Sequence, residues 1–165
     1  MLVGASERLR AHQGLDAALE ALAAWVSRGV AVHELRHVVD GEAASLTCSG
    51  CPPEVTPLER AELSAYLASF SQPGVGYVAA LQACAAPFRE RERRTEERSA
   101  HGRALERAAR ATISGGCGGP VDAGLYARAR AAEIRYFGAR EPAVPEGFPT
   151  TLAVFPRSTS AVAAR

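Results

Sequence analysis

The chain contains no lysine and no asparagine, and it has 1 tryptophan and 1 methionine among its 165 residues. All 19 basic residues are therefore arginine, and 18 acidic residues balance them to a formal net charge of +1. This balance provides no bulk electrostatic attraction to nucleic acid or to an acidic membrane surface. The exclusive use of arginine, together with abundant alanine, is typical of a GC-rich bacterial genome, so we do not interpret it as a binding signal.

The sequence also lacks a hydrophobic run long enough to cross a bilayer. Its two most apolar stretches, residues 17–26 and 75–88, are interrupted by Glu20 and Gln82. Both fall short of the ~20 apolar residues that a membrane-spanning helix needs. The first residues show neither the basic start nor the apolar run of a secretion signal. We therefore expect a cytoplasmic protein, while an extracytoplasmic location stays open if the chain is a fragment of a longer protein.

The composition favours a single compact domain. Hydrophobic residues make up 47% and charged residues 22% of a 17.3 kDa chain, which is enough apolar material for a buried core. Apolar residues recur mostly at helical spacing. The predicted fold class is mainly α: a small helical domain over residues 1–137, followed by an irregular, proline-rich tail over residues 138–165.

Two consecutive helices are predicted in the first quarter of the chain. Apolar residues follow a helical spacing over residues 6–27, and Gly29 marks a stop or a bend. Residues 30–40 are predicted to form a second, short helix that is apolar on two sides, as is typical of a buried helix. Residues 41–55 are predicted to form a loop.

The next helix has a clear start signal. Thr56, Pro57 and Glu59 match a capping box, with threonine at the N-cap, proline at the first helical position and glutamate at the third. This helix is predicted to continue to Phe70. Three more helices are predicted, the middle one exposed because it begins with a run of alternating charges: residues 75–86, 88–110 and 121–137. The one plausible strand covers residues 151–155.

Four cysteines are present, and two of them, Cys48 and Cys51, have the C-x-x-C spacing. No second C-x-x-C follows, so a four-thiolate zinc site is not indicated. Disulfides or ordinary buried thiols are the main interpretation. A catalytic redox pair is a weaker one, because that motif normally opens a helix after a strand and here it lies in a predicted loop.

The main chemical signal is an H-E-x-x-H motif on the predicted helix at residues 30–40. His33 and His37 are four residues apart, so a helix places both imidazoles on one face, where they can bind one metal ion. Glu34 lies beside that face, where its carboxylate can hold and deprotonate a metal-bound water. Zinc suits this motif, because three protein ligands leave a fourth position for water, whose pKa falls towards ~7. The alternative is a core helix whose histidines only form hydrogen bonds.

A third protein ligand has to come from another part of the chain. The nearby carboxylates are those of Asp40, Glu42, Glu54, Glu59 and Glu62. The capping box engages Glu59. Glu62 lies one turn further along the same helix, facing away from solvent if Leu58 and Ala65 point inwards. A carboxylate on a buried helix face is costly unless it is paired or bound to a metal, which makes Glu62 the better candidate.

These motifs resemble those of the gluzincin zinc metallopeptidases, over about residues 30–70. In that class an H-E-x-x-H helix supplies two ligands and a downstream helix supplies a glutamate, a pattern that Glu62-x-x-Ala65-Tyr66 resembles. The resemblance implies that His33, His37 and Glu62 bind Zn²⁺ and that Glu34 is the general base. Gluzincins place a sheet ahead of the zinc helix, whose edge strand holds the substrate backbone, whereas the residues preceding His33 are predicted to be helical.

Four further residues are candidates for supporting roles beside this ligand set. Asp40, three residues after His37, is a candidate acceptor that orients a ligand imidazole. Tyr66, Tyr77 and His101 are candidate donors to a developing oxyanion by residue type only. Tyr66 is expected to serve mainly in core packing, and His101 to be exposed.

The leading hypothesis is a zinc-dependent, metallopeptidase-like hydrolase that acts on the peptide bonds of a peptide or protein substrate, or on a related amide. The alternative is a non-catalytic helical module with a structural metal or disulfides, either a degenerate peptidase or a fragment of a larger envelope protein. A weaker hypothesis is a thiol-redox protein that acts through Cys48 and Cys51.

Overall fold

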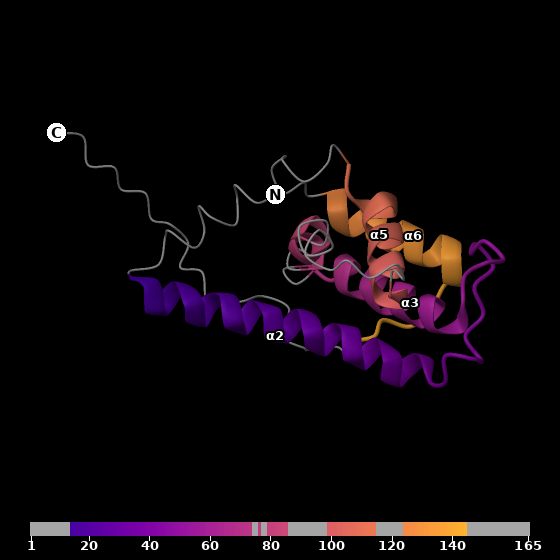
Figure 1. Ribbon diagram of the computed structural model, residues 1–165, viewed down its shortest axis with the longest axis horizontal. Helices are drawn as coiled ribbons and strands as arrows, with labels where there is room; N and C mark the ends of the chain where they lie inside the picture. The colour runs from indigo at the N-terminus through magenta and orange to yellow at the C-terminus, as the bar shows by residue number, and fades with distance from the viewer. Residues whose placement is uncertain (1–13, 74–75, 77–78, 86–98, 115–123, 145–165) are drawn as a thin grey trace.

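The protein is mainly helical in the computed structural model, as the sequence predicts (Figure 1). The structure describes residues 14–73, 76, 79–85, 99–114 and 124–144. Its helices are α2 (Leu15–Asp40), α3 (Pro57–Ser71), α5 (Ala100–Thr112) and α6 (Gly124–Phe137). Residues 79–85 are also helical, and no strand occurs within the described ranges. The strand predicted at residues 151–155 lies outside them.

Helix α3 is the central element of the bundle, because it contacts α2, α5 and α6. In Figure 1 the long α2 runs along one side, and the shorter helices gather above it. Leu63, Leu67 and Phe70 of α3 are fully buried and pack in one core cluster with Trp25 of α2 and Leu125 of α6. Since α3 is covered on most sides, polar residues on it are buried as well.

The start of α3 follows the predicted cap. The Thr56 hydroxyl accepts a hydrogen bond from the backbone N–H of Glu59 at 3.2 Å, and Pro57 occupies the first turn. The other half of the predicted capping box is wrong: the Glu59 carboxylate binds Arg103 at 2.9 Å and Arg107 at 3.2 Å, both on α5. A buried carboxylate gains more from two guanidinium groups than from one backbone N–H.

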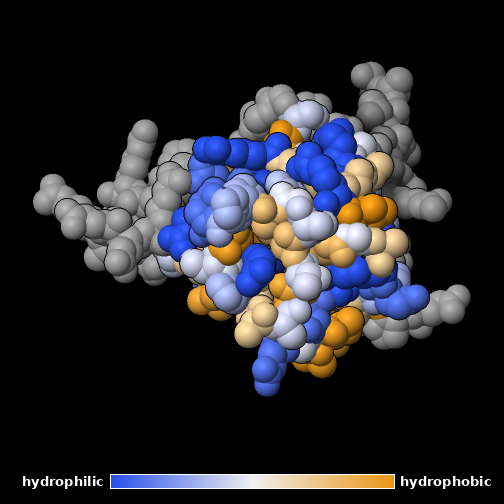
Figure 2. Space-filling model, turned by 90° about the vertical axis from the view of Figure 1, so that its right-hand side faces the viewer, coloured by the Kyte–Doolittle hydropathy of each residue, from blue (hydrophilic) through white to orange (hydrophobic). Residues whose placement is uncertain are grey.

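The break expected at Gly29 is absent, because α2 continues without interruption from Leu15 to Asp40. One glycine inside a helix costs only about 1 kcal/mol, which packing against a neighbouring helix outweighs. The end of the helix is buried on one side only, since Arg36 is 3% exposed whereas Val38 is 77% and Val39 53% exposed. On the end of the molecule seen in Figure 2, hydrophobic residues lie scattered among hydrophilic ones.

Helix α5 starts where the sequence predicted a continuous charged helix. The Ser99 hydroxyl accepts a hydrogen bond from the backbone N–H of Gly102 at 3.2 Å and caps the first turn. The helix predicted over residues 88–110 therefore has a start at Ser99, and residues 86–98 lie outside the described ranges. The buried side of α5 is lined by Ala104 and Leu105, among others.

A buried ion network joins α2 and α6 to the irregular segment at residues 138–144. Asp40 binds Arg36, the Ser64 hydroxyl and, at 3.0 Å, Arg140. Arg140 also binds Glu133 at 3.2 Å. The packed unit therefore extends past Phe137, where the sequence placed the start of the tail, because Arg140 supplies a cation to two carboxylates inside the bundle.

Within the described helices, none combines the length and the apolar character that crossing a membrane requires. Although α2 has 26 residues, charged side chains interrupt it throughout.

Replacing Asp40 by asparagine tests the ion network. The variant leaves the Arg36 and Arg140 guanidinium groups without their shared anion, so we expect the free energy of unfolding to fall by about 3 kcal/mol. Chemical denaturation measures this change. The matched control is Asp16→Asn, an exposed position on the same helix, which should change stability by less than about 0.5 kcal/mol. Equal stability of both variants would contradict the network's role.

The same carboxylate predicts a dependence on pH. Burial raises the pKa of Asp40, but hydrogen bonds from Arg36 and Ser64 and the charges of Arg140 and Arg36 hold that pKa below its usual 3.8. A lowered pKa means that the stabilisation is fully present above pH 3.8 and is lost as the pH falls further. The difference in unfolding free energy between wild type and Asp40→Asn should therefore shrink below this pH, as denaturation at a series of pH values would show.

Candidate metal site

Two imidazoles from α2 and one carboxylate from α3 converge on a single point. The Nε2 atoms of His33 and His37 are 3.2 Å apart, and His33 Nε2 lies 3.2 Å from Oε2 of Glu62. His37 Nε2 lies 3.6 Å from Oε1 of Glu62. Zinc ligands at about 2.1 Å from a tetrahedral ion are about 3.4 Å from one another. The three side chains therefore have the spacing of ligands to one ion.

Local structure explains this convergence. The spacing of four residues puts both histidines on the side of α2 that faces α3. Because α2 does not break at Gly29, His33 and His37 lie on the same rigid helix as the buried Trp25. The capped start of α3 places Glu62 in its second turn, opposite the histidines. Leu58 is exposed, contrary to the sequence argument, but Glu62 and Ala65 are buried.

Glu62 differs from the other buried glutamates in its partners. Glu59 is paired with two arginines, Arg103 and Arg107, and Glu133 with three, Arg36, Arg130 and Arg140. Glu62, with a side chain only 5% exposed, is paired within the described residues only with histidines. A buried carboxylate needs a compensating positive charge. For Glu62 that charge has to come from imidazolium groups or from a metal ion.

The electrostatics of Glu62 follow from this setting. Burial, the largest effect, raises the pKa of Glu62. The hydrogen bond with His33 and the charges of His101, His33 and His37 act in the opposite direction and hold the pKa below its usual value of 4.5. Glu62 is therefore ionised at neutral pH, which is the state that a metal ligand requires.

A third imidazole, from α5, also reaches this carboxylate. His101 Nδ1 lies 2.8 Å from Oε2 of Glu62, and the His101 side chain is 59% exposed. His101 is exposed, as its sequence context predicts, but nothing in that context predicts its contact with Glu62. The cap at Ser99 could have placed His101 in the first turn of a helix, but no local pattern tells which helix that turn faces.

A cavity of about 200 Å³ adjoins the triad. It is bordered by His33, Glu34, Tyr66 and His101, together with Gln82 and small residues. Glu34 is exposed, so its carboxylate borders open space beside His33. The Tyr66 ring lies 4.7 Å from the His33 ring, which puts this tyrosine at the site and not only in the core.

Other sequence candidates lie elsewhere. Both oxygens of Asp40 are bound within the ion network by Arg36, Ser64 and Arg140. The expectation that Asp40 orients a ligand imidazole is therefore wrong, because two arginines outcompete a histidine for it. Tyr77 lies outside the described residues.

Cys48 and Cys51 form a disulfide in the loop between α2 and α3, with their Cα atoms 5.4 Å apart. The neighbouring Gly50 N–H donates to the Tyr136 carbonyl at 3.4 Å, so this loop docks on α6. Cys84 is also disulfide-bonded. In the part of the chain that the structure describes, the candidate metal ligands include no thiolate.

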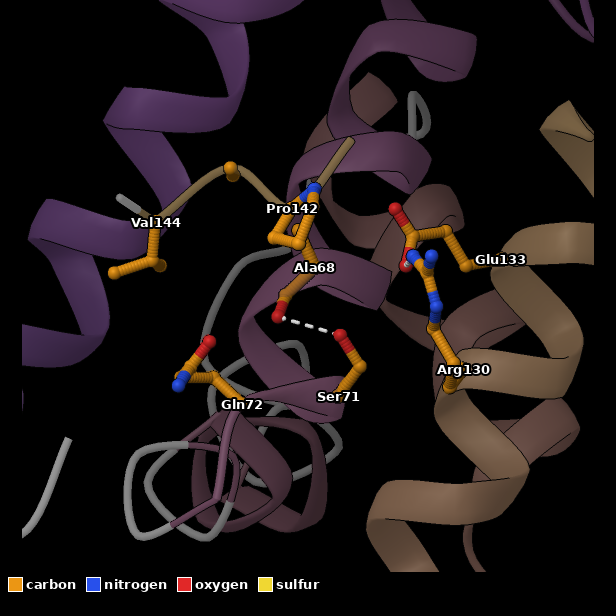
Figure 3. A pocket seen from close by; sticks show the side chains of 8 residues that line it. Ala68, Ser71, Gln72, Arg130, Glu133, Pro142 and Val144 are labelled. Carbon is orange, nitrogen blue, oxygen red and sulfur yellow. Dashed lines mark hydrogen bonds and ion pairs between the residues drawn. The ribbon is translucent and has the colours of Figure 1, made fainter. Parts of the chain in front are cut away.

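A second cavity, of about 210 Å³, lies between α3, α6 and the segment at residues 138–144 (Figure 3). Its charged residues are engaged with each other: Arg130 donates to Glu133 at 2.7 Å and to the Arg140 carbonyl at 3.0 Å. On its wall the Ser71 hydroxyl donates to the Ala68 carbonyl at 2.9 Å. The charged side chains that line this cavity are therefore used by the fold.

Comparisons of the chain with known protein families, with curated proteins and with solved structures find no match. The chemistry of the triad and of its surroundings therefore carries the functional argument.

The triad predicts that the purified protein binds about one Zn²⁺ per chain. Because no arginine among the described residues pairs with Glu62, Glu62→Gln removes a ligand without burying a new charge and should lower zinc affinity by more than about 100-fold. His33→Ala should have a similar effect. Calorimetric titration with zinc measures both, and Glu42→Gln, an exposed acid beyond the end of α2, is the control. Unchanged affinity in Glu62→Gln would show that zinc binds elsewhere.

Proposed function

We propose that the protein is a zinc-dependent hydrolase of peptide or related amide bonds. The observation that supports this most is the buried Glu62, whose partners in the described part of the chain are imidazoles alone and which lies within 3.6 Å of both histidines of the H-E-x-x-H motif. The resemblance of this helix pair to the gluzincin ligand set agrees with the proposal. His33, His37 and Glu62 would hold the ion.

Each residue has a defined task in this proposal. A bound zinc ion supplies Lewis acidity, which lowers the pKa of a coordinated water and polarises a carbonyl. Glu34, at the border of the cavity next to His33, accepts the proton of the attacking water and passes it to the departing amine. Tyr66 borders the same cavity and offers a hydroxyl to the oxyanion that develops on the carbonyl.

The size of the cavity limits the size of the substrates that can bind in it. About 200 Å³ is below the ~300–1,000 Å³ of pockets that enclose a drug-sized ligand. No strand lies within the described residues to hold an extended substrate backbone. We therefore propose short peptides or small amides, which insert one residue-sized group beside the metal, in preference to long polypeptides.

The second candidate function is a non-catalytic module in which the metal only stabilises the bundle. The observation that favours it is the third imidazole, His101, 2.8 Å from Glu62. If His101 joined the ion as a fourth protein ligand, no position would be left for water, and the site would be structural.

The variant Glu34→Gln distinguishes the two functions. It removes the base but leaves the three ligands, so it should keep one zinc and lower hydrolysis by about 10²- to 10⁴-fold. A panel of chromogenic aminoacyl anilides and short peptides provides the activity, and metal analysis provides the zinc content. Glu20→Gln, an exposed position on the same helix, should match wild type. A zinc-loaded wild type without hydrolysis on this panel would favour the structural module.

A further inference from the structure

His101 lies on α5, whereas the three candidate metal ligands lie on α2 and α3. It occupies the first turn of α5, directly after the Ser99 cap, and α5 packs on α3. Its Nδ1 is 2.8 Å from Oε2 of Glu62, which is the shortest contact in the cluster. The capped turn thus presents one ring nitrogen to the carboxylate.

The distance from His101 to Glu62 differs from the distances expected between two ligands of one metal ion. Two ligands on one tetrahedral zinc ion are about 3.4 Å apart, and the contacts of His37 Nε2 with His33 Nε2 and with Oε1 of Glu62 are 3.2 and 3.6 Å. The 2.8 Å contact of His101 is shorter than that spacing and is an ion-pair contact in the distance range of charge-assisted N–H···O pairs. His101 Nδ1 is therefore placed as a partner of the carboxylate and not as a further ligand.

Metal binding increases the need for such a donor. When His33 and His37 bind an ion through Nε2, these nitrogens carry no proton and cannot donate to Glu62. One carboxylate oxygen binds the ion, and the other stays buried and needs a hydrogen bond. Within the described residues, His101 is the one partner of Glu62 that is not itself in the ligand triad.

We propose that His101 is a positioning residue: its Nδ1–H donates to Oε2 of Glu62 and leaves Oε1 for the metal. This inference rests on the metal site of the proposed function and adds a third helix to it. A carboxylate free to rotate can bind an ion through one oxygen or through both. The hydrogen bond from α5 selects one orientation and couples the docking of α5 to metal binding.

Three variants of His101 test this assignment, since the side chains differ in where they place a donor. The amide nitrogen of asparagine lies near the position of Nδ1, and that of glutamine near Nε2. We expect His101→Ala and His101→Gln to weaken zinc binding on the order of 10- to 100-fold, and His101→Asn to stay close to wild type. Zinc affinity is measured in competition with a chromogenic chelator. Arg110→Ala, an exposed position on α5, is the control.

The visible spectrum of the cobalt-substituted protein provides a second readout. A positioning role predicts that His101→Ala keeps the band intensity and position of the wild type, because the coordination number is unchanged. A changed spectrum, together with an asparagine variant as weak as the alanine one, would assign His101 as a ligand and overturn the proposal. So would three variants with wild-type affinity. A wild type that binds no zinc would instead remove the metal site itself.

Discussion

The bundle is organised by the need to compensate carboxylates inside it. Helix α3 is covered by three neighbours, yet it carries Glu59 and Glu62 on buried positions. A buried carboxylate without a positive partner costs several kcal/mol, so each has to be matched by a side chain from another helix. Arg103 and Arg107 of α5 match Glu59. This ion pairing joins α5 to α3 beside their shared hydrophobic core.

The same constraint operates at the other end of the bundle. Asp40, at the end of α2, and Glu133, on α6, share Arg140 from the irregular segment that follows α6. Arg36 adds a second cation to Asp40. The irregular segment at residues 138–144 is thereby joined to α2 and α6. Its Arg140 supplies a positive charge without which the buried carboxylates would be destabilised.

Glu62 differs from the other buried carboxylates, which are paired with arginines. Among the described residues its partners are three imidazoles and no arginine. An imidazole carries a positive charge only when it is protonated, whereas a bound metal ion would compensate the carboxylate at any pH at which it stays bound. The disulfide loop between α2 and α3 and the capped turn of α5 bring the three elements together. A cation at this point would join α2, α3 and α5, and the adjoining cavity would give a small substrate access to it.

The features that the sequence alone predicts correctly are those set by contacts between residues only a few positions apart. A spacing of four residues puts His33 and His37 on one helix face whatever surrounds it. The Thr56 cap marks the start of α3 because its hydroxyl binds a backbone group only three residues away. The high cost of a buried acid also selected Glu62 correctly among five nearby carboxylates as the one that meets the histidines.

Packing between segments far apart in the sequence determines the continuity of α2, the partners of Asp40 and the position of His101. Gly29 is a weak helix former, but the contacts of α2 with α3 keep the helix continuous, which local propensity does not reveal. Asp40 lies next to His37 in sequence and binds Arg140, 100 residues away. His101 belongs to a separate helix, α5, which packs on α3 through buried apolar residues and through the arginines that pair with Glu59. Such contacts depend on how whole helices fit together, and no local pattern of residues records that fit.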